Sequence, residues 1–152
     1  MAKALNFDTG IEEFSLNGAI TVRFNPTDSA FVEKMYSTFT ALETKQDDYQ
    51  KRVDEIGGDS EQLFAYSRER DAEMRAIIDD LLGEGVSDAV FVNGDDPINC
   101  YALAKGLPMW INLMLAIAET VQESFAAQQK QGDPRLKKLS KKYEAMANKY
   151  KK

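Results

Sequence analysis

The chain contains no histidine and one cysteine, Cys100. The lack of histidine excludes a histidine general base, a histidine metal ligand and a serine–histidine–aspartate triad on this chain. A single cysteine excludes an intrachain disulfide and a thiolate zinc cluster. Because Cys100 lies on an apolar face, we expect it to be a buried structural residue. Composition therefore removes the commonest catalytic sites.

The sequence also lacks long hydrophobic runs. The longest one, Leu113–Ala118, is far shorter than the ~20 residues that a membrane-spanning helix needs. The first residues, 1–7, have no extended apolar stretch of the kind found in a signal peptide. Both absences predict a cytosolic protein. A length of 152 residues favours a single domain with a core of its own.

Charge is divided unevenly along the chain. Residues 128–152 hold nine lysines and arginines and only two acids, whereas residues 1–127 carry a net charge of −13. A basic tail on an acidic body indicates docking on an acidic surface, of this chain or of another. The alternative is a solvated terminus. Nucleic acid is a weaker candidate partner, because the body would repel phosphates, and a membrane surface is weaker still.

The N-terminal region predicts a β-hairpin. Residues 13–17 and 20–24 alternate polar and apolar side chains, and Asn17-Gly18 between them is a strong tight-turn signal. The apolar face comprises Phe14, Leu16, Ile20, Val22 and Phe24. A two-stranded hairpin is marginal alone, so it must lie on helices or pair its edge with another chain.

A long amphipathic helix is predicted from Ser29 to about Ile56, with Thr27 or Asp28 as its N-cap. Its apolar positions have heptad-like spacing, with Gln46 in the gap: Met35, Phe39, Leu42, Tyr49, Val53 and Ile56. The helix is either an ordinary core helix or the seam of a coiled-coil dimer. Together with the hairpin edge, this stripe predicts a homo-oligomer.

A second helix is predicted between the Asp59–Gln62 capping box and Gly83. Its expected buried stripe comprises Leu63, Phe64, Met74, Ile77, Ile78, Leu81 and Leu82. Oppositely charged residues at helical spacing, Arg70–Glu73 and Asp71–Arg75, indicate an exposed face. Residues 86–92 are predicted to form either a last helical turn or a short strand.

Two further helices are predicted, over residues 97–105 and 108–130, separated by a break at Gly106-Leu107-Pro108. The helix over 108–130 is the most apolar element, which places it at the centre of the core. After Gly132-Asp133-Pro134, a basic amphipathic helix of about 18 residues carries an apolar stripe that needs a partner: Leu136, Leu139, Tyr143, Met146 and Tyr150.

Acidic residues form no recognisable catalytic or metal site. Consecutive acids such as Asp47-Asp48, Asp79-Asp80 and Asp95-Asp96 point about 100° apart on a helix, so they do not converge as a general acid–base pair would. The segment 93–96 lacks the ligand spacing of a calcium loop, and Gly83-Glu84-Gly85 lacks the rest of a phosphate-binding motif. We therefore expect no catalytic residue, no metal and no cofactor.

Six short sequence segments are distinctive and occur at residues 5–10, 22–28, 68–75, 77–84, 101–104 and 106–110. Together they resemble the tail assembly chaperones encoded in the tail-gene clusters of long-tailed bacteriophages and prophages, and the resemblance spans residues 5–127. Members of that family have a short N-terminal β element and then a helical body with a Leu/Phe-Gly-Glu phrase after a helix. The corresponding residues here are Leu82-Gly83-Glu84. These sequence segments are characteristic of a fold and not of a catalytic activity.

The resemblance implies a non-enzymatic role in the bacterial host cytoplasm. Such chaperones bind the tape measure protein, a long helical chain with exposed apolar stripes, and keep it soluble until tail tube subunits polymerise around it. They are absent from the mature virion, and in many phages a longer form arises by ribosomal frameshifting. The implied partners are the tape measure protein and, secondarily, the tail tube protein.

The predicted client contacts fall in two groups. The first is the stripe of the C-terminal helix, namely Leu136, Leu139, Tyr143 and Met146, and the second is Phe31, Phe39 and Tyr49. The second group has an equal alternative, which is packing within the chain. Other function classes stay open: a structural tail completion or connector component of the virion, another protein-interaction module, or an enzyme with an unfamiliar carboxylate site.

The fold class that these patterns predict is mainly α with a small N-terminal β-hairpin, an α+β arrangement. Residues 1–127 form the hairpin and one compact helical body, and residues 128–152 form a separate basic C-terminal helix.

Overall fold

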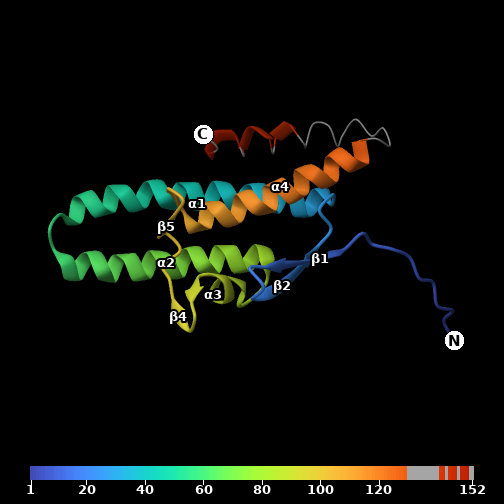
Figure 1. The fold of residues 1–152 in the computed structure, drawn as a ribbon, viewed down its shortest axis with the longest axis horizontal. Coiled ribbons are helices and arrows are strands. Elements are labelled where there is room, and N and C mark those ends of the chain that lie inside the picture. The colour runs from blue at the N-terminus through green and yellow to red at the C-terminus, as the bar shows by residue number, and fades with distance from the viewer. Residues whose placement is uncertain (130–140, 143, 147, 151–152) are drawn as a thin grey trace.

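The computed structural model describes residues 1–129, 141–142, 144–146 and 148–150. Its architecture is mainly helical with a small N-terminal hairpin, which confirms the predicted fold class. The helices α1 (Ser29–Ile56) and α2 (Ser60–Leu82) lie antiparallel, and α4 (Met109–Gln129) lies beside α1 (Figure 1). The short helix α3 (Val86–Val90) lies near the hairpin.

The hairpin pairs β1 (Glu12–Leu16) with β2 (Ile20–Phe24) in antiparallel register. Asn17 and Gly18 both have positive φ, of 54° and 70°, as the predicted tight turn requires. The apolar face also forms as predicted: Phe24 stacks between Phe14 and Phe31, with ring centroids 4.6 and 4.2 Å apart. The hairpin is thus anchored to α1 through an aromatic stack.

Helix α1 has the predicted bounds, and its N-cap is Asp28, which accepts a hydrogen bond from the backbone N–H of Ala30. Val32, Met35, Phe39 and Leu42 are buried in the core. Gln46, which interrupts the apolar stripe, accepts a 3.0 Å hydrogen bond from the indole N–H of buried Trp110. The polar residue that interrupts the heptad pattern therefore makes a hydrogen bond to α4.

Helix α2 begins at the predicted capping box, in which Asp59 accepts from the backbone N–H and the side-chain amide of Gln62. Met74, Ile78 and Leu81 are buried as expected. Phe64 is a correction, because it is 65% exposed. Phe64 lies in the second turn of α2, at the end that follows the loop from α1. This end of α2 extends beyond both the hairpin and α4 (Figure 1).

The helix predicted over residues 97–105 is wrong. This segment instead forms the ends of two minimal antiparallel pairs: β3 (Val92–Asn93) with β4 (Asp96–Pro97), and β5 (Leu103–Ala104) with β6 (Leu107–Pro108). The physical reason is that polar groups of α2 bind the backbone of this loop, as described below. Bonds from α2 compete with the helical hydrogen bonds that the sequence pattern favoured.

The predicted break before Pro108 and the following helix are confirmed, since α4 begins at Met109. Its first backbone N–H groups are not left unpaired: Met109 donates to the carbonyl of Ala102, and Trp110 donates to the carbonyl of Cys100. The apolar face of α4 supplies core side chains along its length: Trp110, Ile111, Met114, Ile117, Ala118, Val121 and Phe125.

Candidate interaction surfaces

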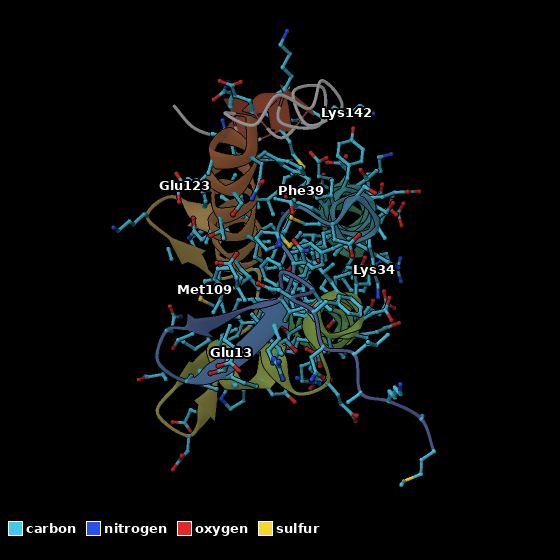
Figure 2. The ribbon with its side chains drawn as sticks, turned by 90° about the vertical axis from the view of Figure 1, so that its right-hand side faces the viewer. Glu13, Lys34, Phe39, Met109, Glu123 and Lys142 are labelled. Atoms are coloured by element: carbon cyan, nitrogen blue, oxygen red, sulfur yellow. The ribbon has the colours of Figure 1, made fainter. Side chains whose placement is uncertain are left out.

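The C-terminal segment packs on α1 of its own chain. Its described residues between 141 and 150 are helical, and Met146 is buried. The ring of Tyr150 meets Phe39 edge-on, with centroids 5.2 Å apart. Figure 2 shows Phe39 between α1 and α4, with Lys142 of the C-terminal segment above them. The described residues of the tail between 141 and 150 therefore dock on a surface of their own chain, one of the two options that the charge of the tail left open.

Glu43 on α1 is the polar centre of this junction. Its carboxylate accepts hydrogen bonds from the ammonium group of Lys149, at 2.5 Å, and from the hydroxyl of Tyr150. The hydrogen bond to Glu43 raises the pKa of Lys149 above its ordinary value. Burial, followed by the bond to Glu43, raises the pKa of Tyr150. Both groups are protonated at neutral pH even at their ordinary pKa values, so both donate to Glu43 there, and the raised pKa values extend this to more alkaline pH.

A groove of about 310 Å³ lies along this junction. Tyr36, Phe39, Thr40 and Glu43 of α1 line one side. Lys142, Ala145, Met146 and Lys149 of the C-terminal segment line the other. The groove is amphipathic, with aromatic and aliphatic groups beside a carboxylate, and the C-terminal segment forms one of its walls.

Four of the predicted client-contact residues lie among the described residues, in three different environments. Leu136, Leu139 and Tyr143 lie outside the described residues. Met146 and Phe39 line the same groove and are buried there. Phe31 is half-buried under the hairpin, against Phe24. The structure thus brings Met146 and Phe39 together, and it separates Phe31 from them.

Tyr49 belongs to a cluster of tyrosines between α1, α2 and the loop before α4. Its ring stacks on Tyr101 at 4.5 Å and on Tyr66 at 5.6 Å. The guanidinium of Arg70 lies over Tyr66 at 5.1 Å and donates to its hydroxyl. Burial raises the pKa of Tyr101. Tyr49 therefore packs within its own chain, which is the alternative that the sequence analysis gave for this residue.

Sequence reasoning missed Glu43 and Lys149 as parts of the junction. Tyr150 was recognised as part of the apolar stripe but was not among the predicted contacts. The sequence signal that could have identified them is charge. A basic helix that packs on the long helix is expected to pair with acidic side chains there. Several acids on α1 offered that charge, and tertiary packing selected Glu43.

A polar stripe on α2 holds the loop that leads to α4. Ser67, Asp71, Arg75 and Asp79 recur every four residues and so lie on one face of the helix. Asp79 accepts from the backbone N–H groups of Gly85 and Ser87, at 3.2 and 2.8 Å. These bonds cap the start of α3.

Arg75 is the centre of that stripe and is buried. Its guanidinium pairs with Asp71 at 2.9 Å and donates to the backbone carbonyls of Ser87, Phe91 and Ile98. The other carboxylate oxygen of Asp71 accepts from the backbone N–H of Cys100 at 2.7 Å. The predicted Asp71–Arg75 pair is present, but the prediction that it marks an exposed face is wrong, because the loop covers it.

Cys100 is fully buried, as its sequence context predicts. Burial raises the pKa of its thiol, and the neighbouring Asp71 raises it further. The thiol is therefore protonated at neutral pH and is a poor nucleophile.

Among the residues that the structure describes, no three histidine, cysteine, aspartate or glutamate side chains gather closely enough to hold a metal ion. Asp79, one of the paired acids, is occupied as a helix cap. The described helices include none that is long and apolar enough to cross a membrane.

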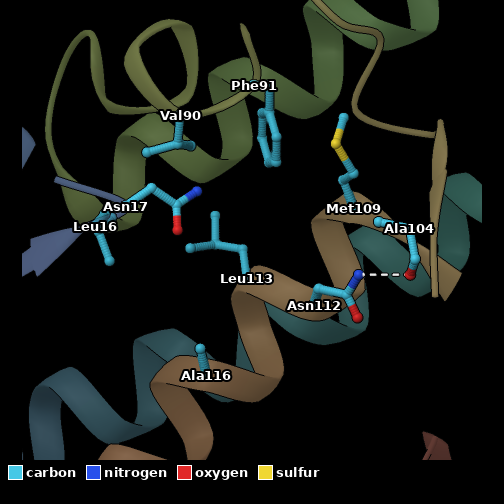
Figure 3. A pocket seen from close by; sticks show the side chains of 9 residues that line it. All are labelled: Leu16, Asn17, Val90, Phe91, Ala104, Met109, Asn112, Leu113 and Ala116. Carbon is cyan, nitrogen blue, oxygen red and sulfur yellow. Dashed lines mark hydrogen bonds between the residues drawn. The ribbon is translucent and has the colours of Figure 1, made fainter. Parts of the chain in front are cut away.

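An apolar pocket of about 290 Å³ lies at the turn end of the hairpin (Figure 3). Val90 and Phe91 line it from the end of α3, and Met109, Leu113 and Ala116 line it from α4. The hairpin contributes Leu16 and Asn17, and the loop before α4 contributes Ala104. The side-chain amide of Asn112, which completes the lining, donates to the Ala104 carbonyl at 2.9 Å.

Comparison with known proteins returned no matching family model, no matching curated protein and no matching solved structure.

Proposed function

We propose that this chain is a non-enzymatic tail assembly chaperone that binds the tape measure protein and keeps it soluble in the host cytoplasm. The resemblance of residues 5–127 to that family suggests the role. The observation that carries the proposal is the packing of the described residues between 141 and 150 on α1, beside the groove that they form with it. A surface that accepts one amphipathic helix is suited to another, and the client is a long helical chain with apolar stripes.

The C-terminal junction suggests that two of the predicted contact residues, Phe39 and Met146, contact the same client. Phe39 and Met146 line the same groove and are buried in the free chain. If the C-terminal helix swings off α1, both become available to a client helix. The contacts at Glu43 involve an exposed lysine and a half-buried tyrosine, and the exposed ion pair is one that a client can displace at modest cost.

The acidic body suits a chaperone that must stay apart from its neighbours. Residues 1–127 carry a net charge of −13, so chaperone–client complexes repel one another. The tail tube protein, as a second partner, and self-association of the chaperone are part of the same proposal.

Co-expression with the tape measure protein of the same genome tests the proposal. Full-length chain is expected to keep the tape measure protein in the soluble fraction and to co-purify with it. A truncation ending at Gln131 is expected to lose most of this activity, since it removes the C-terminal helix. Leu103→Ser, which changes a large exposed side chain away from the groove, is the matched control and is expected to behave as wild type.

Failure of the full-length chain to bind would overturn the chaperone proposal. The chain should then be sought in purified phage particles, where its presence would favour a structural tail completion or connector component. If the truncation binds as well as the full-length chain, the client contact lies elsewhere than the C-terminal helix.

A further inference from the structure

The N-terminal arm, residues 1–11, is extended and carries apolar side chains that no part of its own body covers. Leu5 is 87% exposed and Phe7 is 82% exposed. The arm leaves β1 and runs away from the helices (Figure 1). An exposed phenylalanine and leucine close together on one segment are typical of a contact surface.

The base of the arm is fixed in direction. Gly10 has φ of 72° and donates to the side chain of Asp8, and the amide of Asn25 donates to the Thr9 carbonyl at 2.9 Å. A Cβ at Gly10 would lie 2.6 Å from the Asn25 amide nitrogen, so the close approach requires glycine. The arm is therefore presented outward by a built turn.

The apolar pocket at the turn end of the hairpin is of the right size and chemistry for the arm. An apolar cavity of about 150 Å³ can bind benzene, and this pocket has about 290 Å³. In Figure 3 the side chains of Phe91 and Leu113 point toward each other across it. A phenylalanine ring would fill that space against Val90, Met109 and Leu113.

Phe7 cannot reach the pocket of its own chain while the clamp at Gly10 holds. Phe7 is three residue steps from Gly10, a span of at most about 10 Å. The pocket begins at Leu16, six residues beyond Gly10 along an extended strand, which is a span of about 20 Å. Arm and pocket lie at opposite ends of β1, so they can meet only between two copies.

We propose that the arm of one copy inserts Phe7 into the apolar pocket of a second copy. Charge favours this occupant, since residues 1–7 carry Lys3 and no acid, whereas the body that receives them is strongly acidic. Leu5 lies two residues from Phe7, on the same side of an extended chain, and packs beside it. Reciprocal exchange of two arms closes a dimer.

Sedimentation velocity over a range of protein concentrations tests the inference. Wild type is expected to self-associate, and Phe7→Ser is expected to weaken the dimer at least tenfold, because a buried ring is lost. Ala116→Trp, which fills the pocket from α4, is expected to weaken it similarly. Phe64→Ser is the matched control, since Phe64 is an exposed phenylalanine on α2 and its loss leaves association unchanged.

Disulfide trapping tests the partner site directly. A mixture of Phe7→Cys chains and Ala116→Cys chains is expected to give a mixed crosslinked dimer, whereas Phe64→Cys mixed with Ala116→Cys is not. The native Cys100 is buried and does not compete. A monomeric wild type, unchanged association of Phe7→Ser, or crosslinks only between two Phe7→Cys chains would each overturn the inference. These readouts need no client, so they are independent of the chaperone assay.

Discussion

Arg75 on α2 and Lys149 in the C-terminal segment both pair with a carboxylate on a helix, but their environments differ. The side chain of Arg75 is 11% exposed, and it also holds three backbone carbonyls. The side chain of Lys149 is 63% exposed, pairs with Glu43 and lies over the ring of Tyr150, 5.5 Å from its centroid. A buried pair with several partners is structural, because its loss leaves charges without water. An exposed pair is worth little and can exchange partners.

The difference separates the molecule into a fixed part and a replaceable part. The stripe on α2 determines the path of residues 85–100 and so the position of α4. The C-terminal junction instead packs Met146 and Tyr150 against the core and joins them to α1 through the exposed pair at Glu43. A fixed body with an exposed, exchangeable contact is consistent with the proposed chaperone role.

Arg75→Met gives the largest expected effect. It leaves Asp71 and the loop carbonyls without their donor, so we expect the free energy of unfolding to fall by about 3–5 kcal/mol. Urea denaturation measures it. Arg68→Met, at an exposed position of the same helix, is the control and should cost less than about 0.5 kcal/mol. An equal effect of both variants would remove the distinction between the two regions.

Gln46→Leu tests the other buried polar contact of the body. The change leaves the indole N–H of Trp110 without its acceptor, and we expect a loss of about 1–3 kcal/mol. The double variant Gln46→Leu with Trp110→Phe removes both partners and should lose less than the two single changes added together. Additive losses would show that the hydrogen bond contributes nothing measurable.

Lowering the pH tests a third ion pair, between Lys45 and Glu73, whose exposure lies between those of Arg75 and Lys149. The hydrogen bond from Lys45, together with the charge of Arg70, lowers the pKa of Glu73 below its ordinary value of 4.5. The stabilisation is therefore present above pH 4.5 and is lost as the pH falls through the lowered pKa. After solvent screening we expect at most about 1 kcal/mol. Glu73→Gln should flatten this acid-side slope of the unfolding free energy, and an unchanged slope would contradict the assignment.

Glu43→Gln gives the smallest expected effect on the whole chain. It weakens the contacts to Lys149 and Tyr150, so backbone amides of residues 144–150 should exchange faster with deuterium. The midpoint of urea unfolding should stay the same, since the body does not depend on the junction. Added salt should have the same local effect on wild type. A lower unfolding midpoint would mean that the C-terminal segment is part of the body.

The sequence by itself determined the local elements. Asn17-Gly18 specified the hairpin, Asp28 and Asp59 specified two helix starts, and Pro108 marked the break before α4. These features depend on backbone conformations and caps formed by near neighbours in the chain, which a sequence pattern records. The apolar spacing likewise predicted most of the core, as with Met35, Phe39 and Met74.

Only the tertiary structure decided what the charged residues do. Asp96-Pro97 looks like a helix start, yet Arg75 and Asp71 bind the following backbone and hold it as a loop. Glu43, one of several acids on α1, became the receptor for the C-terminal segment. The physical reason is that a charge acquires its role from burial and from partners distant in sequence, and neither is recorded by spacing along one helix.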